Sequence, residues 1–408
     1  MPLDRVANVL AQHVAGLEEK GTAKGQEAVV VAVLPPAGSR GPRIRLKGEG
    51  AREFIRMNSN SYLGMGLRPE VVAAEEAATR QYGAGPGAVR FISGTYEPHV
   101  ALEGRLAEFH GREAALAFSS AYAGMVSVVA PLTTERTVLV SDELNHNCII
   151  NAMRLARPAE KAVYKHNDMA DLERALSAMK GKGERALVIT DGIFSMRGDH
   201  APLPELIEIC RRHDADFSEN VIVLVDDSHG VGAFGRTGRG TEEYTGAPPC
   251  DILVGTLGKA FGVNGGYVTS SAVLIRFLRE SSPMYIYSNP ITPGEASAAL
   301  RALELLDSTG GTALLERLRA LQQRFEQGLV RLGFETIPGA HPVTPLVVRD
   351  TARTRALVRH LRDHGVLATG LAYPVVPRGD DEIRFQVNAD HTDADIDYVL
   401  DVLSRFEA

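Results

Sequence analysis

Residues 251–262 read Asp-Ile-Leu-Val-Gly-Thr-Leu-Gly-Lys-Ala-Phe-Gly, and this stretch indicates both the fold class and the chemistry. A short apolar run, Ile252–Val254, precedes one lysine, Lys259, that is set among small and apolar residues. An amine is nucleophilic only when neutral, and burial lowers the pKa of a lysine, by up to about 3–5 units in extreme cases. Gly258 and Gly262 leave room beside it for a flat cofactor. The segment predicts an imine-forming lysine, with a surface lysine in a glycine-rich turn as the alternative.

A phosphate-binding loop is excluded at this lysine. The pattern G-x-x-x-x-G-K-[ST] requires glycine where this chain has Leu253, and serine or threonine where it has Ala260. A dinucleotide-binding loop is the other alternative, because residues 230–235 match G-x-G-x-x-G after an apolar run. That fingerprint must open a helix, yet Pro248 and Pro249 follow a glycine-rich stretch, so a nicotinamide or flavin dehydrogenase is disfavoured.

Composition narrows the class of protein. A chain of 408 residues with 44% hydrophobic and 23% charged residues predicts two globular domains. A net charge of −7 offers no basic surface, so we expect no nucleic-acid partner. The three cysteines lack C-x-x-C spacing, which predicts buried thiols in a reducing compartment and no metal site. The longest apolar run, residues 28–36, is too short to span a bilayer, and we expect a cytoplasmic protein without a membrane partner.

Short apolar runs alternate with helical-period segments in the middle of the chain, which predicts βα units around a mainly parallel sheet. The expected strands are residues 114–118, 137–140, 186–190, 221–225, 252–254 and 266–269, and the expected helices are 145–155, 168–179 and 202–213. A helical stretch at 293–332 then leads to strands near 346–348, 366–368 and 383–387, with helices at 351–364 and 393–406. We therefore predict an N-terminal helix and linker arm (1–57, with the Pro- and Gly-rich linker at 34–50), a large domain (58–300) and a smaller α+β C-terminal domain (301–408).

Polar residues follow the predicted strands at the edge where parallel sheets bind ligands. They are Ser119, Ser120, Ala121 and Tyr122; Ser141, Asp142 and His146; Asp191, Gly192 and Ser195; Asp226, Asp227, Ser228 and His229; and Lys259. Each has a structural explanation when taken alone, such as a helix cap at Asp226 or a core histidine at His146. Because five strand ends meet at one edge, we interpret them together as a site.

Six segments together resemble the α-oxoamine synthases, a family of fold-type I enzymes that use pyridoxal 5′-phosphate (PLP). The segments are Asn58–Gly64, Arg90–Thr95 with His99 and Glu103, Asp142–His146, Asp191–Met196, Val225–Gly230 and the Lys259 segment. The resemblance extends from about residue 58 to residue 392. It implies the fold-type I PLP transferase fold.

The resemblance also implies roles around the cofactor. Lys259 would hold PLP as an imine and later transfer the proton at the substrate Cα, and Asp226 would pair with the pyridinium nitrogen. His146 would stack on the pyridine ring, while Ser195 and His229 would bond the phenolate oxygen. These five positions form the catalytic and cofactor-binding set that we expect around the ring.

The phosphate of PLP is expected at Thr256 and at the backbone N–H groups around Ser120, Ala121 and Tyr122, where a helix N-terminus favours an anion. In the family, residues of a second subunit complete this cradle, which corresponds to residues 288–292 here. The resemblance therefore implies a homodimer with a composite active site.

The segment Pro-Val-Val-Pro-Arg-Gly at 374–379 is similar to a family segment that precedes the arginine gripping the amino-acid carboxylate. Arg384 matches that arginine, and Asn60 would assist it. Three departures bear on the substrates: Glu382 where relatives often carry arginine, Ser61 where Asn or Asp is usual, and Val263-Asn264 in place of smaller residues.

The implied function is a PLP-dependent acyltransferase that joins a small α-amino acid to an acyl thioester, such as an acyl-coenzyme A, and gives an α-amino ketone with or without loss of the carboxylate. The segment at 374–379 favours a glycine C-acetyltransferase-like member. An aminotransferase or a carbon–carbon lyase of the same fold is the alternative, because the fold alone does not choose the reaction.

Overall fold

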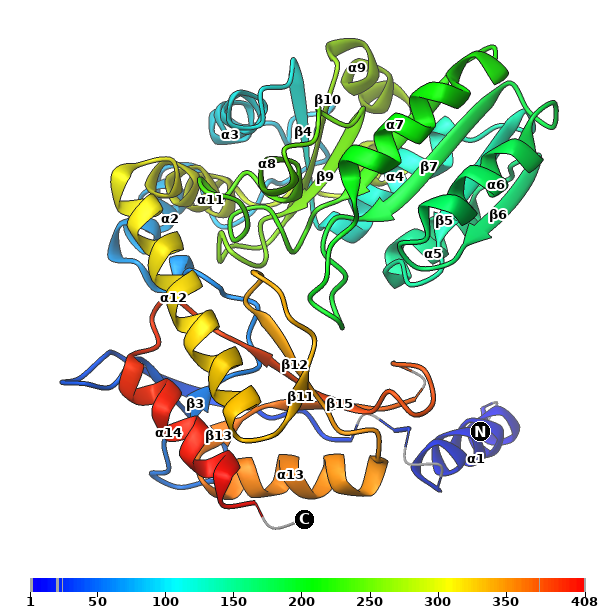
Figure 1. The fold of residues 1–408 in the computed structure, drawn as a ribbon. Coiled ribbons are helices and arrows are strands. Elements are labelled where there is room, and N and C mark those ends of the chain that lie inside the picture. Colours follow the sequence, from blue (N-terminus) through cyan, green and yellow to red (C-terminus); the bar gives the residue numbers. More distant parts are fainter. Residues whose placement is uncertain (1–2, 20–21, 24, 374, 407–408) are drawn as a thin grey trace.

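The computed structural model describes residues 3–19, 22–23, 25–373 and 375–406. A seven-stranded sheet forms the centre of its upper part in Figure 1. Its strand order is β4-β10-β9-β8-β7-β5-β6, and only β10 is antiparallel to its neighbours. The strands are β4 (Ala114–Phe118), β5 (Thr137–Asp142), β6 (Glu160–Tyr164), β7 (Arg185–Asp191), β8 (Val221–Asp226), β9 (Ile252–Thr256) and β10 (Gly266–Ser270). The predicted mainly parallel sheet is confirmed.

Both faces of this sheet are buried, because successive residues of a strand point to opposite faces and both sets are apolar. On β5, Leu139 belongs to one apolar cluster, whereas Val138 and Val140 belong to the other. The first cluster includes helices α4 (Ala121–Leu132), α5 (Asn147–Leu155) and α9 (Ala272–Ser281), and the second includes α6 (Met169–Met179) and α7 (Leu203–His213). A strand buried on both faces is a continuous apolar run, which explains why most of these strands could be predicted.

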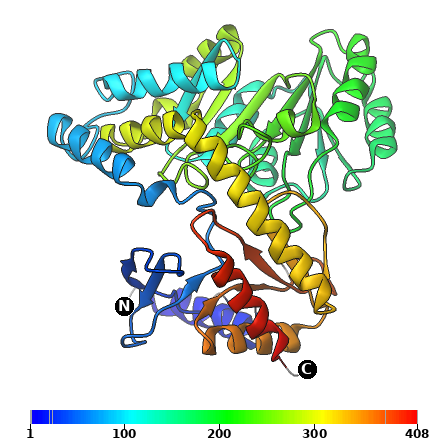
Figure 2. The same cartoon turned by 60° about the vertical axis from the view of Figure 1, so that its left-hand side comes forward.

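A smaller antiparallel sheet, β11-β12-β15-β14, lies in the C-terminal part of the chain, and its buried residues belong to the same apolar cluster as Val138 and Val140. Its strands are β11 (Glu335–Thr336), β12 (Val343–Val347), β14 (Thr369–Leu371) and β15 (Glu382–Gln386), and the helices near it are α12 (Thr309–Arg331), α13 (Thr351–Asp363) and α14 (Asp393–Ser404). Figures 1 and 2 both show α12 running from the helices of the large sheet down to this smaller sheet. Beside it, β3 (Ile55–Arg56) pairs in parallel with β13 (Val366–Leu367).

Three sequence-based expectations differ from the structure. The predicted linker contains strand β2 (Arg43–Leu46), which pairs with β1 (Val30–Leu34) because Ile44 and Leu46 are buried. The helical stretch at 293–332 is two helices, α11 (Pro293–Leu306) and α12, since the Ser308 hydroxyl caps the second one. Strand β6 was missed, because its sequence Glu-Lys-Ala-Val-Tyr lies at the sheet edge and is only partly apolar.

The N-terminal helix α1 (Asp4–Glu19) is present and has no buried residue. Residues 1, 2, 20, 21 and 24 of the predicted N-terminal arm, and Pro374 of the segment at 374–379, lie outside the described residues. The remaining elements are η1 (Met65–Leu67), α2 (Pro69–Tyr82), α3 (Glu97–Phe109), η2 (Asp214–Asp216), α8 (Thr241–Thr245) and α10 (Pro283–Ile286). Among the described residues, every helix is too short or too polar to cross a bilayer.

Candidate active site

A cavity lies beyond the carboxyl ends of β7, β8 and β9. The lining residues are Ala121, Tyr122, His146, Cys148, Asp191, Ile193, Ser195, Asp226, Ser228, His229, Thr256 and Lys259. The structure therefore brings together all the residues predicted around the cofactor except Ser120, whose hydroxyl caps α4 by accepting a hydrogen bond from the Ala123 N–H.

Lys259 is held in the loop that joins β9 to the antiparallel strand β10. Backbone hydrogen bonds from Leu257 to Gly265 and from Val263 to Leu257 close this loop. Gly262 has a φ of 70°, and a Cβ there would collide with the backbone nitrogen of Gly66. The expectation that Gly262 leaves room for a cofactor is therefore wrong, because this glycine instead allows two backbone segments to touch.

The amine of Lys259 loses its proton more readily than the amine of an exposed lysine. Burial lowers the pKa of Lys259 to about 8, although the Asp226 carboxylate opposes the shift. On the other side of the lysine, a Cβ at Gly258 would meet no atom closer than 3.5 Å, so this glycine does leave open space. The sequence-based prediction of a nucleophilic lysine agrees with this environment.

Two carboxylates end neighbouring strands beneath the lysine. Asp191 of β7 and Asp226 of β8 are register partners, and both are buried. Asp226 accepts hydrogen bonds from the Ser228 N–H at 3.1 Å and from the Cys148 thiol at 3.3 Å. Asp191 accepts one from the His146 N–H at 2.8 Å. Burial, with the charge of Asp226 as the next cause, raises the pKa of Asp191 well above its usual value.

The cavity also offers a flat ring and an anion site. His146 caps α5 through its ring nitrogen Nδ1, which accepts from the Cys148 N–H, and burial lowers the pKa of this histidine. Helix α4 begins at Ala121, so the N–H groups of its first turn have no acceptor within the helix. These groups form the positive end of the helix dipole, which favours an anion. Thr256, across the cavity, accepts from the Gly258 N–H at 3.1 Å.

The two predicted substrate-binding residues lie beside the cavity and contact each other. Arg384 Nη2 donates to Asn60 Oδ1 at 3.3 Å, and the Tyr62 hydroxyl donates to the same oxygen at 3.3 Å. Tyr62 also lies 2.8 Å from His229 Nδ1, which links this pair to the cavity wall. Among the described residues, no carboxylate forms an ion pair with Arg384; the Gln386 amide lies 2.6 Å from its Nη1, so its neighbours are amides and its charge is not neutralised.

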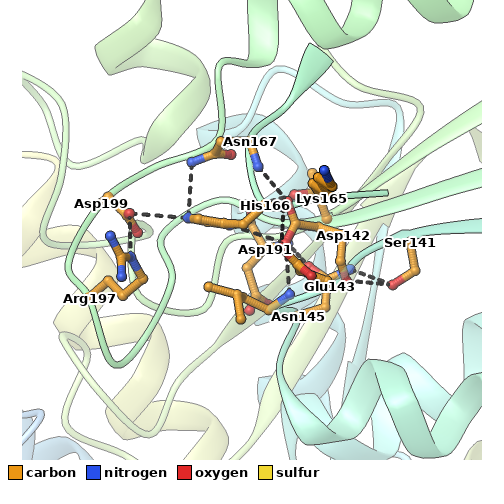
Figure 3. Close-up of polar contacts among 12 residues, drawn as sticks. Ser141, Asp142, Glu143, Asn145, Lys165, His166, Asn167, Asp191, Arg197 and Asp199 are labelled. Atoms are coloured by element: carbon orange, nitrogen blue, oxygen red, sulfur yellow. Dashed lines mark hydrogen bonds and ion pairs between the residues drawn. The ribbon is translucent and has the colours of Figure 1, made fainter. Parts of the chain in front are cut away.

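A tight hairpin at residues 193–200 carries Ser195 into the site. It is closed by Phe194 N–H donating to Asp199 and by the bridge between Ile193 and His200. Figure 3 shows His166 between the carboxylates of Asp142 and Asp199: Nδ1 is 3.1 Å from Asp142 Oδ1, and Nε2 is 3.1 Å from Asp199 Oδ2. Because both ring nitrogens face carboxylates, both must carry a proton.

Hydrogen bonds keep His166 charged. Burial alone would lower the pKa of His166, but the hydrogen bonds to Asp142 and Asp199 outweigh it and raise the pKa to about 9. The imidazolium also packs edge-on against Phe194, with ring centroids 4.3 Å apart. His166, Tyr62 and Cys148 were not identified from the sequence as site residues, because they contact residues that are distant in the chain. Tyr62 and Cys148 each end a polar segment, Asn-Ser-Asn-Ser-Tyr and Asn-His-Asn-Cys, which was the available signal for those two.

Comparisons with known proteins agree with this geometry. The family model of class I and II aminotransferases matches residues 52–403. The chain is 39% identical over 370 residues to the 8-amino-7-oxononanoate synthase of Geobacter sulfurreducens, a match covering 90% of this chain and 92% of that protein. It is 40% identical over 355 residues to the enzyme of the same name from Symbiobacterium thermophilum, covering 87% and 88%.

Solved structures give the same result. Serine palmitoyltransferase from Sphingomonas wittichii superposes with a TM-score of 0.87 at 27% identity, covering 98% of this chain and 97% of that one. The S. paucimobilis serine palmitoyltransferase with bound PLP gives 0.86 at 25% identity and the same coverage. The fold and the site thus define a fold-type I PLP-dependent transferase. Within that class, the chain belongs to the α-oxoamine synthase family.

The residues in the cavity fit PLP. The cofactor needs a nucleophilic amine, a carboxylate for its ring nitrogen and an anion site for its phosphate, and Lys259, Asp226 and the start of α4 offer these three groups around one cavity. Members of the α-oxoamine synthase family are PLP-dependent acyltransferases, so this chain is an enzyme of that class.

The lowered pKa of Lys259 predicts how the cofactor is captured. The neutral amine is the reactive form, so capture of PLP by the apoprotein should accelerate with rising pH and level off above about pH 8. The measurement is the rate of the visible absorbance change, followed by borohydride reduction and peptide mapping. Label on Lys259 is expected and should be absent from Lys259→Ala; a plateau reached only near the usual lysine pKa of about 10.4 would contradict the buried environment.

The His166 bridge predicts a pH-dependent hairpin. The folded pKa of His166 lies above its ordinary value, so the stabilisation is complete below about pH 6.5 and is lost as pH rises through about 9. His166→Asn should speed hydrogen exchange of residues 193–200 at neutral pH, after correction for intrinsic rates. His213→Asn removes a similar 3.0 Å contact to Asp216 outside the site and should leave the hairpin unchanged. Equal exchange in the wild type and His166→Asn would show that the bridge does not hold the hairpin.

Proposed function

We propose that this enzyme joins a small α-amino acid, such as glycine, to the acyl group of a thioester and releases an α-amino ketone. The observation that carries the proposal is the position of the unpaired Arg384 near Lys259. Burial lowers the pKa of Lys259, and the charge of Arg384 adds to that effect, so the two cations are close enough to influence each other. A bound α-amino acid would place its carboxylate at Arg384 and its Cα at Lys259.

The residues predicted around the cofactor each have a role in this proposal. Lys259 binds the cofactor and later accepts the proton from Cα. PLP, when bound, withdraws electrons from Cα and so makes that proton acidic. Asp226 keeps the ring nitrogen protonated, and the imidazole of His146 covers the ring. Ser195 and His229 hydrogen-bond the phenolate oxygen.

The phosphate of the cofactor is expected at the start of α4. The N–H groups of Ala121 and Tyr122 and the hydroxyl of Thr256 would hold it, with Ser120 acting through its cap on the helix. Arg384 grips the amino-acid carboxylate with two parallel hydrogen bonds, since its planar guanidinium matches a carboxylate. Asn60 orients that guanidinium.

We infer that the active enzyme is a homodimer. The side chains of Phe91, Ile92 and Tyr287 are 66%, 67% and 79% exposed, which is costly for large apolar groups in an isolated chain. Tyr287 directly precedes residues 288–292, the segment expected to complete the phosphate cradle of a second copy. A cytoplasmic location stays a prediction, as does the preference for an acetyl thioester.

The function is tested by release of free thiol. Purified enzyme with PLP should release coenzyme A from an acyl-coenzyme A only when glycine or another small amino acid is present, because Cα must lose its proton before it can attack the thioester. The product should be an α-amino ketone by mass spectrometry. Transfer of the amino group to a keto acid, with no thiol released from any thioester tried, would instead identify an aminotransferase.

Replacing Arg384 tests the carboxylate grip. Arg384→Lys should raise the KM for the amino acid by about tenfold or more and leave the absorbance of bound PLP unchanged, because an ammonium group cannot form the two parallel hydrogen bonds. The exposed Arg324, which pairs with Asp397, provides the matched control Arg324→Lys. An unchanged KM in Arg384→Lys would assign this arginine a structural role.

A further inference from the structure

A second cavity adjoins the cofactor cavity and shares Ser195 with it. One wall is the hairpin that His166 anchors, with Phe194 and Met196 facing the space, and the opposite wall is formed by residues 375–377. Most of the lining is apolar. Such a space suits a hydrocarbon chain that extends from the reacting atoms.

One carboxyl group in this cavity has an unsatisfied oxygen. Glu382 is only 4% exposed, and its Oε1 is buried without a hydrogen-bond partner. A buried oxygen of this kind is costly unless a ligand or water completes it. Glu382 follows the loop at 375–381 and lies two residues from Arg384 on β15, so both side chains point to the same face of the strand.

The charged groups around Glu382 leave it unpaired. Arg197, on the hairpin, donates to Asp199 at 2.9 Å, and Asp380, also in the lining, is exposed. Arg384 donates to Asn60, and no ion pair joins it to Glu382 in the described part of the chain. Burial raises the pKa of Glu382 to about 8, although Arg384 and Arg197 oppose the shift. Above that pH the carboxylate can only accept hydrogen bonds.

We propose that this cavity is the acyl-chain subsite, and that Glu382 determines its specificity by rejecting thioesters whose chain ends in a carboxylate and favouring chains that carry a hydroxyl or another hydrogen-bond donor. The inference rests on the proposed function, because the amino acid is assigned to Arg384 and Lys259. With the small amino acid placed there, the acyl group is the remaining part of the substrates that could fill a largely apolar space next to Ser195.

The chemistry of the carboxyl group gives the direction of selection. When ionised, Glu382 repels a second carboxylate in a poorly solvated space, whereas a hydroxyl group donates to the free Oε1 in either state. The product named for the 8-amino-7-oxononanoate synthases ends in a carboxylate. This chain should therefore discriminate against such an acyl donor, and more strongly as pH rises through about 8.

Three coenzyme A thioesters of equal chain length test the subsite: hexanoyl, 6-hydroxyhexanoyl and adipoyl. With glycine as the amino acid, the wild type should show a kcat/KM for 6-hydroxyhexanoyl at least about tenfold above that for adipoyl at pH of about 9, because like charges are disfavoured in a desolvated site. The ratio should be smaller at pH of about 7. Ratios on one enzyme cancel the titration of Lys259.

Two variants separate Glu382 from general charge effects. Glu382→Gln keeps the shape but removes the ionisable group, so the ratio should fall to within about threefold and lose its pH dependence. Asp363→Asn removes an exposed carboxylate at the end of α13, outside the lining of this cavity, and should leave the ratio nearly unchanged. A ratio unaffected by Glu382→Gln would overturn the proposal. If Glu382→Gln instead changes the preference for serine over aspartate as the amino acid and leaves the thioester preference intact, the proposal is also overturned, because Glu382 would then act on the amino-acid site.

Binding measurements separate this proposal from the proposed function. Calorimetry with the unreactive S-alkyl coenzyme A thioethers of the same chains should show the same order of affinity in the PLP-loaded enzyme. If no thioester releases thiol but the thioethers retain this order, the function fails and the subsite stands. If thiol is released while the thioethers bind equally well to the wild type and Glu382→Gln, the subsite fails and the function stands.

Discussion

Two buried carboxylates at the ends of adjacent parallel strands impose the constraint on which the site depends. The pairing of β7 with β8 fixes Asp191 beside Asp226, and neither side chain can move into solvent. Burial raises the pKa of Asp191, with Asp226 as a further cause, so the pair resists carrying two negative charges. A cation above the pair relieves this repulsion. Lys259 supplies one, and the protonated ring nitrogen of PLP is the proposed second, which ties cofactor binding to the strand ends themselves.

The surrounding histidines contribute hydrogen bonds without adding charge. Burial lowers the pKa of His229 well below its usual value and that of His341 to about 3, so both stay neutral while His341 bonds the His229 carbonyl oxygen. Lys259 and Arg384 then supply the positive charge next to His229, whereas the charged His166 is paired with Asp142 and Asp199. This matters because additional imidazolium groups would depress the pKa of Lys259 further and compete with Arg384 for the substrate carboxylate.

The sequence was sufficient for six of the seven strands of the large sheet and for most of the residues around the cofactor cavity. Strands such as β8 are apolar on both faces, so their ends could be located, and the polar residues after those ends had to meet at one edge. Other features depend on distant contacts that no local pattern encodes. The bond between Tyr62 and His229 joins residues 167 positions apart, and Gly262 is needed because Gly66 touches it. His166 follows β6, an edge strand whose mixed polar and apolar sequence did not predict a strand, so the position of His166 at a strand end was not recognised.

A carboxyl group and a guanidinium two residues apart on β15 would allow one strand to contact both substrates. Glu382 and Arg384 lie on the same face, about 6.6 Å apart along the strand, which is too far for a direct hydrogen bond between side chains that extend in parallel. Each group therefore remains available for its own ligand, an anion at Arg384 and a donor at Glu382. The hairpin at 193–200 borders both spaces through Ser195 and Met196, and His166 holds that hairpin by its charge. Loss of that charge should thus loosen the cofactor contact and the acyl subsite together, whereas loss of Glu382 should affect the acyl subsite alone.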